Sequence, residues 1–190
     1  MTTLQGRATV LETTTAPLSV SGTPGTFPAT LSITGVNVHI LDGTGSTQST
    51  SGLGNLIVGY NALGNDLGAG DVRTGSHNLI LGDLNNYFSY GGLVAGRDNA
   101  IIGRYASVSG GVRNTASGLA ASVSGGDFNT ANGDFASVSG GLINTASGLL
   151  ASVSGGYNNT AGSDFASVSG GQSLTQSARY GWTGGDYHTP

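Results

Sequence analysis

The sequence contains no cysteine and no lysine, and only 8% of its residues are charged. Without cysteine, disulfide bridges and thiolate metal sites are excluded. The six basic residues, all arginine, are outnumbered by ten acidic residues, and the formal net charge is −4. No basic patch for nucleic acid or for an anionic membrane surface is therefore expected.

Long apolar runs are also missing. No stretch reaches the ~18 consecutive apolar residues of a membrane-spanning helix. The first residues form neither the charged nor the apolar part of a secretory signal. We expect no direct membrane insertion by this chain, and we expect that any export signal or anchor would lie outside it.

Glycine is abundant, with 35 residues, and one short motif dominates the second half of the chain. The string ASVSGG occurs five times at a constant spacing of fifteen residues, beginning at Ala106, Ala121, Ala136, Ala151 and Ala166. Between the copies, Asn-Thr-Ala recurs at a fixed offset. Such recurrence at a short period is typical of a solenoid, in which each repeat is one coil.

Each repeat combines two short strands with glycine corners. In the first copy Ala106 and Val108 alternate with serines, which is the period of a strand with one apolar face. The pair Gly110-Gly111 permits a sharp turn, and Asn-Thr-Ala-Ser forms the second strand. Helix is disfavoured because Ser, Val, Gly, Asn and Thr are poor helix formers. The sequence predicts an all-β, two-sided parallel β-roll, with side-chain hydrogen bonds between asparagines along the column 114, 129, 144 and 159.

Alignment of the glycine corners predicts about eight coils of 14–15 residues, with an insertion at 65–73 in the first interval. The inward-facing position of these coils, the predicted roll core, is occupied by Ile57, Ile80, Val94, Val108, Val123, Val138, Val153 and Val168. We expect three regions. Residues 1–51 are a Thr/Gly/Pro-rich arm followed by strands over 29–41 that cap the roll. Residues 52–175 are the roll, and residues 176–190 form a C-terminal cap.

In the early coils both faces of the first strand are apolar, which is typical of a strand buried on both sides. One side is the interior of the roll, and the other needs a partner. A second copy of the chain is the expected partner, because one valine and a few alanines per coil make a thin core. The predicted homotrimer interface comprises Leu56, Val58, Leu79, Leu81 and Leu93.

Two further columns carry bulky apolar residues. The positions after each glycine pair vary from coil to coil, so we place them on an outward corner. Their apolar members form a candidate partner-contact strip, to be weighed against neutral drift on a solvated loop: Phe128, Leu142, Ile143 and Tyr157. A more uniform column, expected at a seam between subunits, contains Tyr105, Phe135, Leu150 and Phe165.

The repeats resemble the YadA-like heads of trimeric autotransporter adhesins. Residues 55–62 and 78–82 are closest to the head repeat of that family, and the later coils resemble a fifteen-residue variant of it. The resemblance covers about residues 52–175. It implies a left-handed β-roll, a trimer with the first strand of each coil facing the threefold axis, and adhesion at a bacterial surface. This chain departs from the family pattern at Gly110 and its equivalents, where the family has a second inward aliphatic residue.

No catalytic, cofactor or metal constellation is found. The three histidines are far apart, Glu12 is the single glutamate, and the repeated serines have no general base beside them. We expect a non-enzymatic, extracellular or cell-surface attachment head whose ligand is a host matrix protein, a cell-surface protein or a glycan. A structural spacer, filament element or phage-fibre tip is the alternative. An ice-binding solenoid is a further alternative, because the Ser and Thr columns form regular hydroxyl arrays.

Overall fold

The computed structural model describes residues 18–21, 30–64 and 70–185, and side chains from residue 31 onward. Two compact units are present, Met1–His39 and Ile40–Pro190. The first contains strands β1 (Leu18–Ser21) and β2 (Thr30–Ile33), which pair antiparallel with Leu18 opposite Ile33. Of the strands expected over 29–41, only the first is present, and it ends at Ile33. Gly35, at φ +73°, interrupts the extended backbone, and no strand forms over 36–41.

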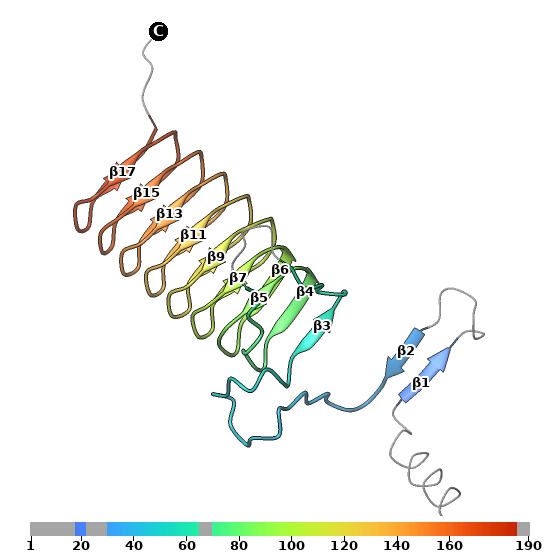
Figure 1. The fold of residues 1–190 in the computed structure, drawn as a ribbon. Coiled ribbons are helices and arrows are strands. Elements are labelled where there is room, and N and C mark those ends of the chain that lie inside the picture. Colours follow the sequence, from blue (N-terminus) through green and yellow to red (C-terminus); the bar gives the residue numbers. More distant parts are fainter. Residues whose placement is uncertain (1–17, 22–29, 65–69, 186–190) are drawn as a thin grey trace, which may run out of the picture. The chain divides into compact units, whose positions relative to one another are not determined.

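The second unit is a parallel β-solenoid of two sheets (Figure 1). The nine-stranded sheet holds, in spatial order, β18 (Trp182–Thr183), β16 (Ser167–Val168), β14 (Ser152–Val153), β12 (Ser137–Val138), β10 (Ser122–Val123), β8 (Ser107–Val108), β6 (Leu93–Arg97), β4 (Leu79–Asp83) and β3 (Leu56–Val58). The seven-stranded sheet holds β17 (Thr175–Gln176), β15 (Thr160–Ala161), β13 (Thr145–Ala146), β11 (Thr130–Ala131), β9 (Thr115–Ala116), β7 (Ala100–Ile101) and β5 (Asn86–Tyr87).

Each complete coil contributes one strand to each sheet, and equivalent residues pair in register, as Val123 does with Val108 and Val138. Seven coils are complete, from β4 with β5 to β16 with β17. The predicted number of eight is wrong by one. The coil that begins with β3 gains no second strand, because its equivalent position, Arg73, makes only an isolated bridge to Tyr87. The first half of the predicted insertion, residues 65–69, lies outside the described residues.

The interior between the two sheets consists of parallel columns of mostly small apolar side chains. Ile80, Val94 and the five repeat valines are at most 1% exposed, as are the alanines that begin each ASVSGG copy. Ile57 differs, because its side chain is 44% exposed. It has the same register as Ile80, but β3 is an edge strand whose coil has no complete second layer to cover it.

A buried asparagine column fastens each coil to the next. The Oδ1 atom of Asn114 accepts the backbone N–H of Asn129 at 2.9 Å, and its Nδ2 atom donates to the carbonyl oxygens of Gly110 and Gly126. The expected side-chain to side-chain ladder is therefore wrong. Three backbone groups satisfy the amide instead, a carbonyl of its own coil and a carbonyl and an N–H of the next. The column ends at Leu174, whose N–H donates to Asn159.

The repeat register continues beyond the predicted boundary at 175. Trp182 pairs in parallel with Ser167, fifteen residues earlier, so residues through Thr183 extend the nine-stranded sheet. The last part of the expected cap, residues 186–190, lies outside the described residues. In the part of the chain that the structure describes, no helix is long and apolar enough to cross a membrane.

Candidate functional site

The outward side of the nine-stranded sheet changes character along the solenoid. In the first three strands it carries two apolar columns, in which Leu56 pairs with Leu79 and Val58 pairs with Leu81. Leu56 is 46% exposed and Val58 56% exposed, whereas Leu79, Leu81 and Leu93 are half-buried by their neighbours. From β8 to β16 serines replace them, since Ser107 follows Leu93 in register, and in β18 Trp182 takes the position of Ser167. We call the part formed by β3, β4 and β6 the apolar face.

One edge of this sheet is a ridge of turn residues that each precede a strand of the nine-stranded sheet. We call it the first ridge: Tyr105, Ala120, Phe135, Leu150, Phe165 and Tyr180. Tyr105, Phe135 and Leu150 are about half exposed, at 49%, 50% and 49%. The Phe165 and Tyr180 rings stack at a centroid distance of 4.7 Å. The expected seam column thus extends by one residue, to Tyr180.

The opposite edge carries the residues that follow each glycine pair. Val112, Asp127, Leu142, Tyr157 and Gln172 are linked by single parallel bridges, which form a narrow third ladder between the two sheets. Each of these residues is followed by a second one on the same edge: Arg113, Phe128, Ile143, Asn158 and Ser173. We call the ten residues together the second ridge. The candidate partner-contact strip lies here. Leu142, Ile143 and Tyr157 are 38–43% exposed.

Both ridges hold non-glycine residues in the left-handed region of backbone space. The φ angles are 51–60° along the first ridge and 54–61° at the second residue of each pair in the second. This conformation costs about 1–2 kcal/mol for an ordinary residue, and Asn tolerates it best. On the second ridge one of these left-handed positions is occupied by Asn158. Along the first ridge none of the six positions is Gly or Asn, and all but Ala120 carry a bulky side chain despite the cost.

Polar contacts support both ridges. On the second, Arg113 binds Asp127 through two hydrogen bonds of 2.7 and 3.1 Å, and its guanidinium lies 4.0 Å from the centre of the Phe128 ring. Beside the first, Asp134 accepts the backbone N–H of Leu119 at 2.9 Å. Two coils further along, Asp164 accepts the backbone N–H of Leu149. These aspartates therefore tie adjacent turns together.

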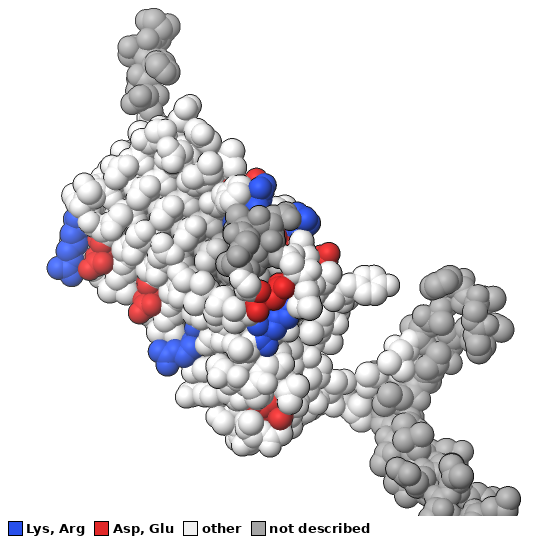
Figure 2. All heavy atoms as spheres, in the orientation of Figure 1, with Lys and Arg blue, Asp and Glu red and all other residues white. Residues whose placement is uncertain are grey.

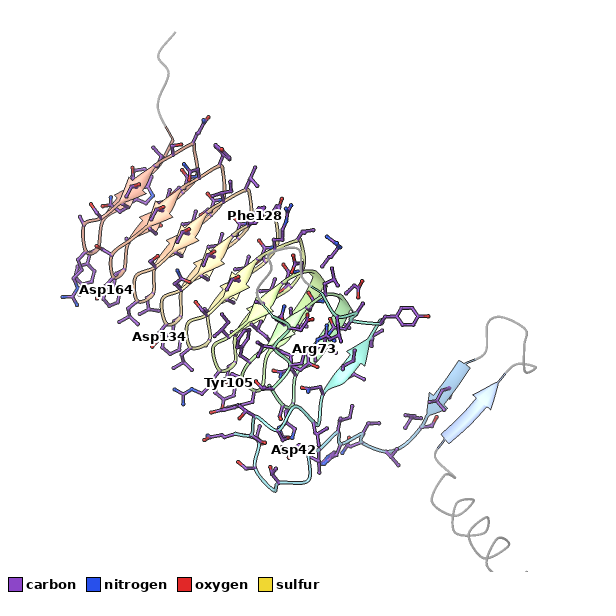
Figure 3. All side chains as sticks on the ribbon, viewed as in Figure 1. Asp42, Arg73, Tyr105, Phe128, Asp134 and Asp164 are labelled. Carbon is purple, nitrogen blue, oxygen red and sulfur yellow. The ribbon has the colours of Figure 1, made fainter. Side chains whose placement is uncertain are left out.

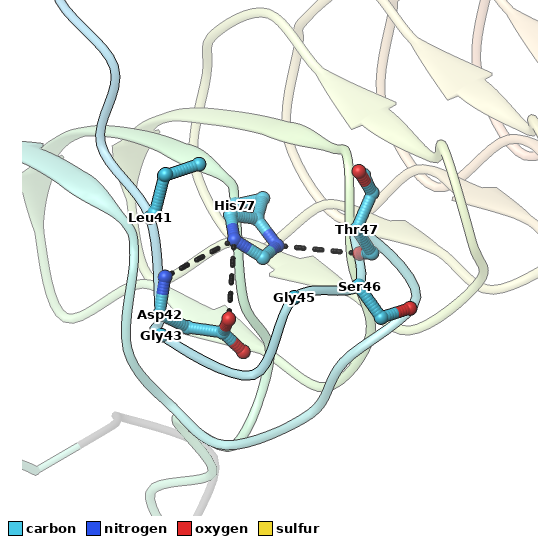
Figure 4. Close-up of a pocket in the computed structure, with 7 residues that line it drawn as sticks. All are labelled: Leu41, Asp42, Gly43, Gly45, Ser46, Thr47 and His77. Carbon is cyan, nitrogen blue, oxygen red and sulfur yellow. Dashed lines mark hydrogen bonds and ion pairs between the residues drawn. The ribbon is translucent and has the colours of Figure 1, made fainter.

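The segment that precedes β3 is fastened to the solenoid by His77 (Figure 4). The backbone N–H of Asp42 points to His77 Nε2 at 3.3 Å, which requires Nε2 to accept, so Nδ1 carries the proton and donates to the carbonyl of Thr47 at 3.2 Å. The Asp42 carboxylate accepts bonds from Thr44 and from the Ser51 hydroxyl.

Hydrogen bonds from the Ser49 hydroxyl and the Thr44 backbone lower the pKa of Asp42 well below its ordinary value, with smaller contributions from the Thr44 and Ser51 hydroxyls. The hollow around His77 is lined by Leu41, Asp42, Gly43, Gly45, Ser46 and Thr47. Both ring nitrogens already bind the loop's backbone, so the geometry is that of a loop anchor.

Charged groups are few on the solenoid. Figure 2 shows them scattered along its edges on the face in view, with no continuous patch of one sign. Among the described residues, no group of three or more His, Asp or Glu side chains is placed to hold a metal ion. The features that stand out chemically are therefore the apolar face and the two ridges.

The sequence located these residues but did not show how they are arranged around the coil.

Comparison with family models, with curated proteins and with solved structures finds no match for this chain.

Proposed function

We propose that this protein is a non-enzymatic attachment head, assembled as a homotrimer and displayed outside a cell. The observation that carries the proposal is the apolar face of β3, β4 and β6. Side chains of the size of leucine and valine are costly to leave in water, and a contiguous apolar patch on one end of a rigid sheet marks an association surface. Trimerisation through this face agrees with the resemblance to YadA-like heads.

The mass in solution tests the assembly. Light scattering is expected to give three times the chain mass of 18.7 kDa. Leu81→Asp should release monomers or unfold the protein, because it places a charge in the apolar face. Thr130→Asp is the matched control, since it adds the same charge to the outward side of the other sheet. A wild-type monomer that folds cooperatively would contradict the proposal.

Adhesion is a separate arm of the test. Beads coated with the purified trimer are expected to bind epithelial-cell monolayers or a surface coated with extracellular matrix, above the level of beads coated with Leu81→Asp protein. Retention at background level by the intact trimer would favour the alternative function, a structural spacer or a fibre element, which requires the rod but no ligand.

A second candidate, ice binding, draws on one specific observation. Ser109, Ser124, Ser139, Ser154 and Ser169 form an exposed column on the nine-stranded sheet, repeating at the coil spacing of about 4.8 Å. In the proposed trimer these hydroxyls face the axis and are inaccessible. A thermal-hysteresis measurement distinguishes the two functions, because an axial serine column gives no hysteresis.

A further inference from the structure

The two ridges lie on opposite edges of the solenoid. Figure 3 labels Tyr105, Asp134 and Asp164 along one edge and Phe128 on the other. The chain order explains the separation, because first-ridge residues directly precede the strands of the nine-stranded sheet and second-ridge residues follow them. The outward side of that sheet therefore lies between the two ridges along the length of the rod.

A ring of identical subunits requires such an arrangement. In a cyclic trimer each contact joins two different surfaces, one on either side of the protomer. If the apolar face lies against the threefold axis, the two edges of its sheet turn toward the neighbouring copies. The first ridge of one copy is then opposite the second ridge of the next.

We infer that each seam of the trimer is made by the first ridge of one copy packing along the second ridge of its neighbour. This inference rests on the proposed trimer and deepens it, by naming the two surfaces that close the ring. It assigns Phe128, Leu142, Ile143 and Tyr157 to the contact between subunits rather than to an external ligand.

The exposure of the ridges supports this assignment. Apolar side chains at equivalent heights, such as Phe135 on one edge and Ile143 on the other, are 50% and 41% exposed in the single chain. Both have φ angles in the left-handed region, 58° and 61°. A seam would bury both columns at once, which explains why residues other than Gly and Asn are kept at the first ridge.

The surroundings of the ridges are compatible with close approach. Between them, from β8 to β16, the strands carry serine at their outward position, so three sheets can come near the axis there. In β18 the outward residue is Trp182, which is 68% exposed. The charges on the second ridge, Arg113 and Asp127, already neutralise each other in a bidentate pair. Asp134 and Asp164 lie beside the first ridge. In the proposed seam they would face a second ridge whose carboxylate, Asp127, is already paired with Arg113.

The absence of native cysteine makes this seam testable by cross-linking. We would prepare Phe128→Cys, Phe135→Cys and the double variant, verify the melting temperature of each, and treat them with a short bis-maleimide. A head-to-tail seam predicts a covalent trimer for the double variant and no linked species for either single variant. A double variant with Thr130→Cys in place of Phe128→Cys, whose thiol lies on the other sheet, should stay unlinked.

Three results would overturn the inference, and they are distinguishable. Dimers from Phe135→Cys alone would show that the first ridge meets itself across a twofold axis. A double variant that is trimeric by light scattering but stays unlinked would leave the trimer standing and exclude this seam. A monomeric mass for the untreated wild-type protein would exclude both the seam and the proposed trimer.

Discussion

The Oδ1 atom of Asn129 accepts the backbone N–H of Asn144 at 2.9 Å, one coil further along the rod. The same amide donates from Nδ2 to the carbonyl oxygens of Gly125 and Gly141, both at 2.9 Å. One buried side chain thus binds three backbone groups, one in its own coil and two in the next. The asparagine column holds the coils in register, because a slip of one residue would leave these groups unpaired.

Asn129→Ala is expected to destabilise the solenoid by about 3–5 kcal/mol, since an unsatisfied buried group costs about 1–3 kcal/mol. Asn132→Ala is the control. Asn132 is exposed, and its side chain accepts one bond, from the Ser117 hydroxyl. That change should stay within about 0.5 kcal/mol. Chemical denaturation of both variants measures the difference, and similar losses would contradict the structural role of the column.

Adjacent glycines give a second matched pair. At Gly126, with φ +87°, an added Cβ would lie 2.2 Å from the carbonyl oxygen of Gly141. At Gly125 nothing lies within 4 Å of the added atom. Gly126→Ala should cost about 3 kcal/mol or more, through backbone strain and displacement of the next coil, whereas Gly125→Ala should be close to neutral. Thermal melts decide it, and equal melting temperatures would show that the coils are spaced differently.

The sequence predicted the repeating part of the fold because the repeat carries its own constraints. An alternation such as Ser107-Val108-Ser109 specifies the faces of a strand, and an unchanged period specifies stacking in register. Ile57 shows where this reasoning fails. Its local pattern matches that of Ile80, yet its exposure depends on whether the same coil completes a second strand, and there Arg73 makes only an isolated bridge to Tyr87.

The ridges show a different limit. Left-handed turns are usually signalled by Gly or Asn, and Tyr105 or Phe135 gives no such signal. Only the backbone geometry reveals that these residues occupy the same conformation as Asn158 on the other edge. For the same reason, the hydrogen bonds of Asp134 and Asp164 to the preceding turns were not evident from a sequence in which each aspartate stands alone.

Val138→Asp is expected to cost more than about 4 kcal/mol, because it places an unpaired charge in an interior where Val138 is 1% exposed. Asp134→Asn should stay within about 0.5 kcal/mol, because an amide oxygen can still accept the N–H of Leu119. Thermal melts of the two variants compare them. Comparable melting temperatures would mean that the inward and outward faces of the strands had been exchanged.

Asn158 allows a test of the left-handed turns in isolation. It is exposed, has a φ of +56°, and donates a bond of 3.2 Å to the Ser173 hydroxyl. Asn158→Ile should lower stability by about 1–2 kcal/mol, because a β-branched side chain crowds this conformation. Asn158→Gly, which removes that crowding, should cost less. If the isoleucine variant is as stable as the glycine variant, the turn is not left-handed in solution.

Asp42 gives the attachment of the N-terminal loop a dependence on pH. Its pKa is lowered in the folded protein by the hydroxyl and amide donors around it, foremost Ser49 and the Thr44 backbone. A carboxyl whose folded pKa is below its unfolded value, about 3.9 for aspartate, contributes stability that is complete above that value and declines as the pH falls toward the folded pKa. Acid should therefore release this loop before the coils from β8 to β16, whose buried side chains are valine, alanine and asparagine. Hydrogen exchange of the Thr44 amide, corrected for its intrinsic pH dependence, should lose protection as the pH is lowered from 5 toward 2. In Asp42→Asn, which removes the carboxylate, protection should be lower at pH 5 and should not change as the pH is lowered from 5 toward 2. Protection that falls equally in both proteins would show that another group controls the loop.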